Sequence, residues 1–99
     1  MTTKQVEFLN YMFKTLTGSE SVAGTLWVDL YPEQCEKLLE NLDNYYKTFE
    51  RVFGTPKVND INQMIFTEII SITPSINVKD ISSVSNKYLN YFKENNYCY

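Results

Sequence analysis

Histidine is missing from this 99-residue chain, and its absence removes more chemistry than any other feature of the composition. Without an imidazole the chain has no Ser-His-Asp or Cys-His nucleophile pair, and no side chain that ordinarily exchanges a proton near neutral pH. Zinc sites built on histidine and the Glu-x-x-His metal motif of helical bundles are excluded as well. Catalysis by paired carboxylates or a lysine stays open, but no spacing marks such a set. We therefore expect no enzyme activity, no catalytic residue and no metal site.

Cysteine and glycine are scarce, and the few that occur fit no cofactor motif. The two cysteines, Cys35 and Cys98, lie far apart in the sequence and cannot form a structural zinc site by themselves. In a cytoplasmic chain we expect both to be reduced thiols, with Cys35 buried and unreactive. The three glycines match neither a phosphate-binding loop nor a dinucleotide-binding turn. We therefore expect no cofactor.

Long apolar runs and an excess of positive charge are also missing. No apolar run exceeds three residues, whereas a membrane span needs about twenty, and the start of the chain lacks the apolar stretch of a secretion signal. The formal net charge is -3, which disfavours direct binding to nucleic acid or to an anionic membrane surface. We expect a cytoplasmic protein, in the host cytoplasm if a phage encodes it, with neither nucleic acid nor membrane as a direct partner.

The composition supplies enough apolar material for one folded domain over residues 1–99. The hydrophobic fraction is 43% and the aromatic fraction is 15%, which is sufficient for a core without metal or disulfide. Among nine basic residues only Arg51 is an arginine, and Asn, Ile and Tyr are abundant. An AT-rich genome encodes such a composition, which suggests a low-GC bacterium or one of its phages.

Apolar residues recur at steps of three and four in four segments, which predicts four amphipathic helices. Thr2 or Thr3 can cap the first, Asn59 the third and Asn77 the fourth. Pro32 suits the first position of the second helix. The predicted helices cover residues 3–16, 32–53, 60–72 and 78–94.

Glycines mark two helix ends, since Gly18 and Gly54 suit the positions after the first and second helices. The second helix has the broadest apolar stripe of the chain. That predicted stripe contains Cys35, Leu38, Leu39, Leu42, Tyr45, Tyr46, Phe49, Val52 and Phe53.

The segment 25–31, which holds the single tryptophan, alternates weakly between apolar and polar residues. Because an isolated strand has nothing to pair with, we favour a connector or a turn of helix there. The sequence predicts an all-α fold, either a four-helix bundle or an orthogonal helical array. The alternative is an α+β fold with strands in residues 25–31 and 64–72.

Four acidic residues step by three and four along the second helix, opposite its apolar stripe: Glu33, Glu36, Glu40 and Asp43. One interpretation is a row of carboxylates that meets a basic patch on a partner or imitates DNA phosphates. The more ordinary interpretation is a solvated face, on which the first glutamates complement the helix dipole.

Several aromatic and apolar residues fall away from the main stripes. Phe8 and Tyr11 lie outside the apolar face of the first helix. The pattern is equally consistent with a partner surface and with a second buried face. Phe66 and Ile70 do the same on the third helix, where burial is favoured. Tyr97 and Tyr99 lie in the tail, which we expect to fray.

Together these features predict a small non-enzymatic protein-binding module, an accessory protein of a phage or low-GC bacterium that inhibits or redirects a partner protein. A helix-turn-helix drawn through residues 61–92 would read bases poorly, because its reading helix begins with Lys79 beside Asp80. The alternatives are an acidic DNA mimic and a structural homo-oligomer, such as a homodimer. The candidate partner-binding residues are Phe8, Tyr11, Glu33, Glu36, Glu40 and Asp43.

Overall fold

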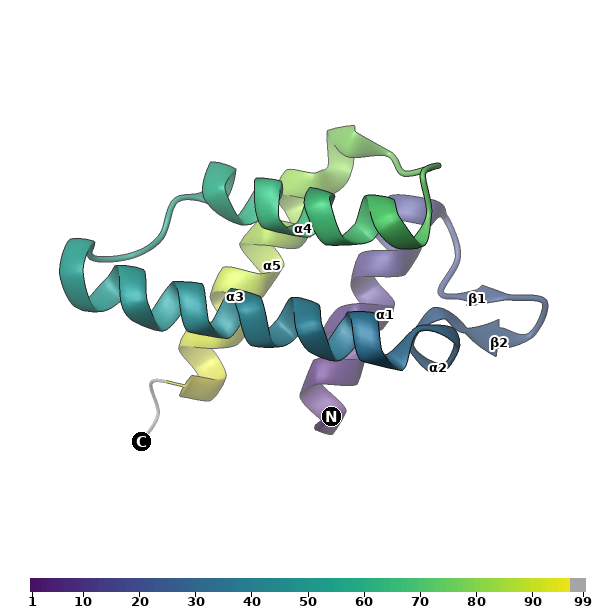
Figure 1. The fold of residues 1–99 in the computed structure, drawn as a ribbon, viewed down its shortest axis with the longest axis horizontal. Helices are drawn as coiled ribbons and strands as arrows, with labels where there is room; N and C mark the ends of the chain where they lie inside the picture. Colours follow the sequence, from purple (N-terminus) through teal and green to yellow (C-terminus); the bar gives the residue numbers. More distant parts are fainter. Residues whose placement is uncertain (97–99) are drawn as a thin grey trace.

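Helices account for most of the chain in the computed structural model, which describes the backbone of residues 1–96 and side chains as far as Lys93 (Figure 1). The sequence expectations for Tyr97, Cys98 and Tyr99 lie outside the described residues. In chain order the elements are α1 (Thr3–Thr17), β1 (Ser21–Val22), β2 (Thr25–Leu26), α2 (Trp27–Leu30), α3 (Pro32–Phe53), α4 (Val58–Ile72), the 3-10 turn η1 (Val78–Asp80) and α5 (Ile81–Asn96). The predicted all-α helical array is confirmed.

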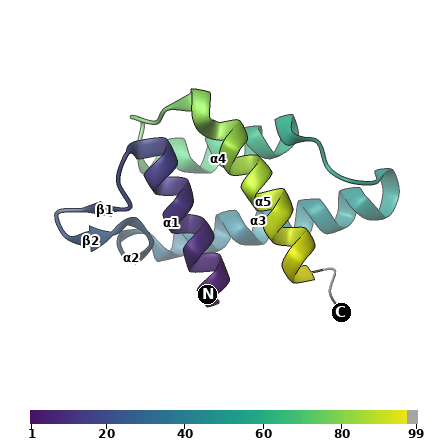
Figure 2. The same ribbon diagram turned by 180° about the vertical axis from the view of Figure 1, so that it is seen from behind.

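The helices form two layers that cross. In Figure 1, α3 and α4 run antiparallel in the front layer, while α1 and α5 lie behind them at a steep angle. Figure 2 shows the rear layer from its own side, with α1 and α5 next to one another. The molecule is therefore elongated along α3, with principal extents of 42 × 26 × 19 Å.

Local signals in the sequence set the ends of α1 and α3. The backbone N–H of Gln5 donates to the Thr2 hydroxyl (3.1 Å), and the Thr2 N–H donates to the Gln5 side chain (2.8 Å), which forms a reciprocal capping box. Gly18 ends α1 with φ 89°, a backbone conformation that glycine adopts without a steric penalty. Pro32 occupies the first turn of α3, as predicted.

The starts of α4 and α5 differ from the predictions. α4 begins at Val58, with Lys57 rather than Asn59 at the capping position and no side-chain cap. Asn77 does accept the backbone N–H of Lys79 (3.2 Å) and donates to the Asp80 carboxylate (2.6 Å), but it caps the 3-10 turn. The predicted fourth helix therefore divides into η1 and α5.

The segment between α1 and α3 contains a hairpin that the sequence argument missed. β2 pairs antiparallel with β1, in the register Ser21 with Leu26 and Val22 with Thr25. Ala23 (φ 52°) and Gly24 (φ 85°) both adopt left-handed conformations, as a two-residue hairpin turn requires. A strand at residue 25 thus has a partner, and the expectation that it would be isolated was wrong. Residues 27–30 do form the predicted turn of helix.

Trp27 anchors this connector to the helices. Its ring stacks on Phe13, with ring centroids 5.4 Å apart, and its indole N–H donates to the carbonyl of Ser19 (3.0 Å). The second alternative strand, over residues 64–72, is helical because it forms most of α4. The α+β alternative is therefore limited to the small hairpin.

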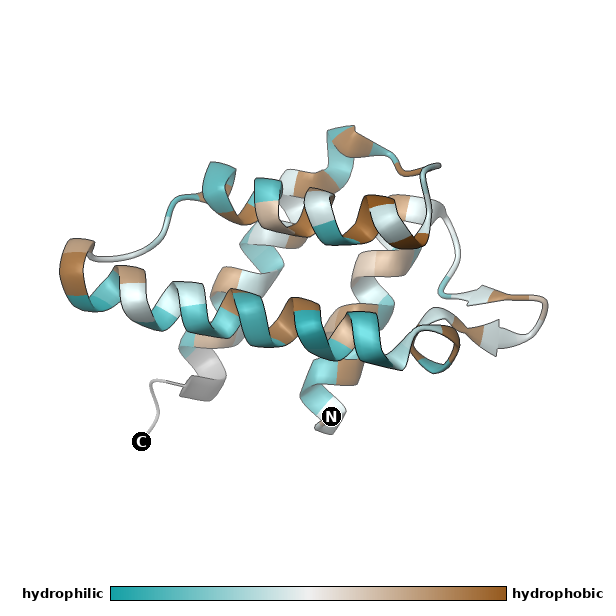
Figure 3. Cartoon of the chain, in the orientation of Figure 1, coloured by the Kyte–Doolittle hydropathy of each residue, from teal (hydrophilic) through white to brown (hydrophobic). Residues whose placement is uncertain are grey.

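The core lies between the two layers, and hydrophobic residues of the helices in both layers contribute to it. Figure 3 shows apolar bands recurring along these helices. Tyr46 of α3 and Phe92 of α5 stack with ring centroids 3.8 Å apart, so aromatic contact joins the front layer to the rear layer. A polar bridge joins α4 to α5, because the Ser85 hydroxyl, fully buried, donates to the Asn62 side chain (2.5 Å). This bridge satisfies the buried polar residue.

The last turn of α3 corrects the predicted core stripe. Cys35, Leu38, Leu39, Leu42 and Tyr46 are buried, but Val52 is 61% exposed and Phe53 is 75% exposed. The physical reason is visible in Figure 1, where the end of α3 extends past the two rear helices. The apolar pattern of α3 continues as far as Phe53, but the rear layer of α1 and α5 ends before it and does not cover this last turn.

Two substitutions on α3 test this difference. Leu42→Ala should lower the free energy of unfolding by about 2–5 kcal/mol, because it leaves a cavity at a fully buried site. Phe53→Ala should change it by less than about 0.5 kcal/mol, because that ring is largely exposed. Urea denaturation followed by helical circular dichroism measures both. A comparable loss in the two variants would contradict the structure.

Candidate functional site

Three of the predicted acidic residues form an exposed row on α3. Glu33, Glu36 and Glu40 are all solvent-exposed, on the side of the helix away from its buried residues. Within the part of the chain whose side chains are described, the only ion pair joins Lys4 to Glu7 at 4.0 Å. Among the described residues, none of the three carboxylates therefore forms a salt bridge, even with Lys37 or Lys47 of the same helix. We refer to Glu33, Glu36 and Glu40 as the acidic row.

Asp43 continues the spacing of the acidic row but faces the interior. It is half-buried and accepts a hydrogen bond of 2.5 Å from the Tyr88 hydroxyl of α5. Burial raises the pKa of Asp43, and this effect outweighs the opposite influences of the Tyr88 hydrogen bond and of Lys47. Asp43 therefore ties α3 to α5, a role that helical spacing alone does not reveal.

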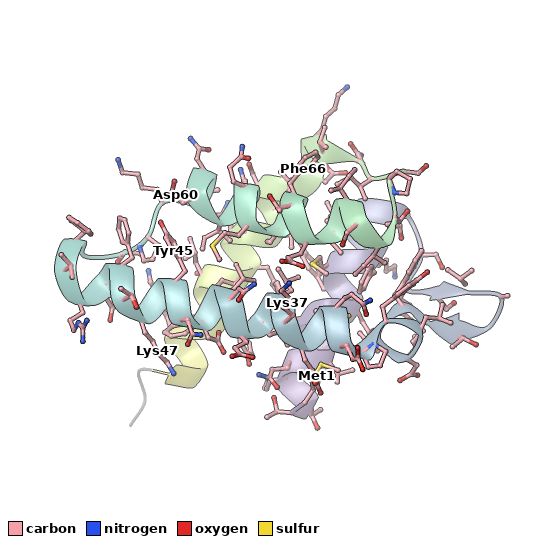
Figure 4. The ribbon with its side chains drawn as sticks, in the orientation of Figure 1. Met1, Lys37, Tyr45, Lys47, Asp60 and Phe66 are labelled. Carbon is pink, nitrogen blue, oxygen red and sulfur yellow. The ribbon has the colours of Figure 1, made fainter. Side chains whose placement is uncertain are left out.

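A hollow of about 380 Å³ lies beside the acidic row. Met1 and Gln5 line one side, while Glu36, Glu40 and Asp43 of α3 line the other. Lys47 also lines it, and Figure 4 places Met1 and Lys47 along the same side of α3. Glu36 and Glu40 of the acidic row thus border a concave surface.

Phe8, a candidate partner-binding residue, is part of the core, so the second buried face that the sequence left open is the correct alternative for it. Its side chain is 3% exposed. It meets Tyr88 edge to face (centroids 5.6 Å apart) and stacks on Tyr91 (6.1 Å). The physical reason is that α5 packs along this flank of α1, which gives α1 a second buried face. Phe8 cannot contact a partner directly.

Tyr11 is 37% exposed and lies apart from the acidic row. The ammonium of Lys87, from α5, lies 5.2 Å from the centroid of its ring, within the range of a cation–π contact. Both residues line a hollow between α1 and α5, which is separate from the hollow beside the acidic row. The structure therefore brings Glu33, Glu36 and Glu40 together and places Tyr11 elsewhere.

The outer side of α4 and the adjoining turn η1 carry a third surface. Phe66 and Ile70 are each 37% exposed, and Val78 is 52% exposed. Phe66 is labelled on α4 in Figure 4, and with Val78 it lines a shallow hollow of about 280 Å³. The sequence favoured burial for Phe66 and Ile70, but their partial exposure leaves an apolar surface.

A groove between α3 and α4 was missed by the sequence argument. It measures about 410 Å³, with Leu38 and Met64 beside three carboxamide side chains. These carboxamides belong to Asn41, Asn44 and Gln63. The only hint of this groove in the sequence is the pair Asn41 and Asn44, which are three residues apart on one helix. Their spacing does not show which helix packs beside them.

Side chains that could ligate a metal do not gather within the described residues. Those residues contain no group of three or more Cys, Asp or Glu side chains able to hold a metal ion. Cys35 is a free, buried thiol, and burial raises its pKa to about 11, so it is protonated at neutral pH. None of the described helices has both the length and the apolar character required to cross a membrane.

No protein-family model, no curated protein and no solved structure matches the chain. The surfaces of the molecule are therefore interpreted from their own geometry.

The buried position of Asp43 predicts how stability depends on pH. Because folding raises its pKa, the folded chain binds this proton more tightly than the unfolded chain, and the associated stability is lost as pH rises through the raised pKa. Asp43→Asn stays neutral while keeping an acceptor for Tyr88. The stability of this variant relative to the natural chain should therefore increase as pH rises from about 4 to 7.

Thermal unfolding at several pH values measures this difference. Asp29→Asn, at an exposed position in α2, is the matched control for removal of one carboxylate. A difference between Asp43→Asn and the natural chain that stays constant over this range would show that Asp43 is not desolvated as described.

Proposed function

We propose that this chain is a non-enzymatic protein-binding module whose acidic row contacts a basic surface on a partner protein. The observation that carries the proposal is a set of three exposed carboxylates on one helix, none of which forms an ion pair with a described residue. Exposed charges of one sign steer a complementary partner and hold it in a defined orientation.

The setting of the row supports this role. Glu33 and Glu40 are seven residues apart, which spans about 10 Å along an α-helix at 1.5 Å per residue. The opposite face of α3 is buried from Cys35 to Tyr46, so the carboxylates stand on a fixed backbone. A rigid acidic row reduces the conformational entropy that binding must overcome.

A small accessory protein of this type acts by covering part of its partner. In the proposed role it inhibits or redirects the partner, within the cytoplasm of a low-GC bacterium or of a host infected by a phage. In the DNA-mimic form of the proposal, the partner is itself a nucleic-acid-binding protein, and the carboxylates occupy positions that phosphates would occupy. Added DNA would then compete with the chain for its partner.

The experiment is affinity purification of the tagged chain from cells of its natural source, with mass spectrometry and quantitative binding to the recovered partner. Glu36→Gln combined with Glu40→Gln should weaken binding about tenfold at low salt, and raising the salt concentration should weaken binding by the natural chain. Helical circular dichroism should be unchanged, because both side chains are exposed.

The matched control combines Glu20→Gln with Asp29→Asn. It removes two exposed carboxylates that lie outside α3 and changes the net charge by the same amount. Equal binding by the two double variants would contradict the acidic row as the contact surface. Absence of any stoichiometric partner would contradict the binding function itself.

A second candidate function, self-association, is supported by the apolar surface of α4 and η1. Phe66, Ile70 and Val78 are exposed together there, and such surfaces bury apolar area when two copies meet. In this form the chain is a structural homo-oligomer, such as a homodimer.

Light scattering at increasing protein concentration tests this candidate. A mass that rises toward twice 11.6 kDa is expected, and Phe66→Ser with Val78→Ser should abolish the rise. Phe53→Ser, which removes an exposed ring at the end of α3, is the matched control. A monomer at every concentration would eliminate the candidate.

A further inference from the structure

The rear layer contains a hollow in which two lysines meet an aromatic cluster. It measures about 290 Å³ and lies between α1 and α5, the two helices that Figure 2 shows next to one another. Lys4 comes from α1 and Lys87 from α5, so the two ammonium groups belong to different helices. The other residues that line it and enter the argument are Glu7, Phe8, Tyr11 and Tyr91.

Flat rings form the apolar part of this hollow. Phe8 is 3% exposed and stacks on the half-buried Tyr91, with ring planes 22° apart. Phe8 also packs against Tyr88, which is fully buried, so its position is set by the core. Phe8 is nearly covered, so the rings that a planar ligand can reach are those of Tyr11 and Tyr91. Because Phe8 holds Tyr91 against the core, binding there costs little conformational entropy.

The charged groups give the hollow a net positive balance. Lys87 lies over the Tyr11 ring at 5.2 Å from its centroid, and it has no carboxylate within ion-pair distance among the described residues. Lys4 lies 4.0 Å from Glu7, and both of these side chains are 64% exposed. Two ammonium groups and one carboxylate leave one uncompensated positive charge, in a chain whose net charge is -3.

We propose that this hollow binds a small organic anion in which a carboxylate or phosphate group is attached to a flat ring. The ring packs against Tyr11 and Tyr91, which Phe8 supports from the core, while the anionic group lies between the two lysines. A bare inorganic anion would leave the aromatic surface uncovered, and a neutral ring would not use the excess positive charge of the lysines. The combination of both features in one ligand matches both parts of the site.

The proposal is independent of the acidic row, which lies on α3. It also gives Tyr11 a role other than contact with a partner protein. Because Glu7 lines the same hollow, its carboxylate opposes anion binding. Removing the charge of a lysine should therefore weaken binding, and removing the charge of Glu7 should strengthen it.

The first measurement is a titration of the full chain with phenyl phosphate and with benzoate, followed by backbone amide NMR. For ligands of this size we expect a dissociation constant on the order of 1 mM for at least one of the two. The amide shifts should be concentrated in α1 and α5. Comparison of the two ligands separates a preference for phosphate from one for carboxylate.

Phenol and inorganic phosphate are the ligand controls, since each carries only one of the two features. Both should bind about fivefold more weakly than the better ligand. Equal binding of phenol would show that the lysines do not contribute, and equal binding of inorganic phosphate would show that the rings do not. Either result overturns the proposal, as does the absence of localised shifts with all four compounds.

Three variants complete the test. Lys87→Gln should weaken binding of the better ligand about fivefold, whereas Glu7→Gln should strengthen it about twofold. Lys57→Gln removes an exposed lysine next to α4 and should leave binding unchanged, so it controls for net charge. Equal effects of Lys87→Gln and Lys57→Gln would reduce the site to general electrostatic attraction and overturn the proposal.

Discussion

The contact of α5 with both layers is the constraint on which the other features depend. Phe92 stacks on Tyr46 of α3, and Tyr88 meets Phe8 of α1 while donating its hydroxyl proton to Asp43. The helix α5 thus contacts both α3 of the front layer and α1, its neighbour in the rear layer. The aromatic area buried in this way, together with the hydrogen bond, favours one relative placement of the helices.

That placement separates surfaces of different chemistry. The acidic row lies on α3, the lysine and tyrosine hollow lies between α1 and α5, and the apolar surface of Phe66, Ile70 and Val78 lies on α4 and η1. A chain of this size with a single core has little interior space for a buried reaction site, so its distinguishing features are on its outside. The proposed contacts with a basic protein and with a small anion use separate surfaces.

Particular residues show why sequence patterns predicted some of these features and missed others. Periodicity identifies one apolar face per helix, which located the buried residues of α3. It left Phe8 open between the core and a partner surface, since it does not show that α1 has a neighbour on a second side. The same periodicity extended the core to Phe53, because it contains no information on where a covering layer ends. The hairpin was missed although Ala23-Gly24 provided a turn, since strands of two residues are too short to show alternation.

The sequence by itself determined the helical character of the four main segments, the bounds of α3 and nearly those of α1, and the lack of imidazole chemistry. Capping boxes, helix-terminal glycines and a first-turn proline act over a few residues, so their effect does not depend on the remainder of the fold. Only the tertiary structure decided which faces are covered. Asp43 faces the interior and not the acidic row, because the hydroxyl of Tyr88, 45 residues away in sequence, donates a hydrogen bond to it. Such pairings arise from the crossing of whole helices, and no local pattern encodes them.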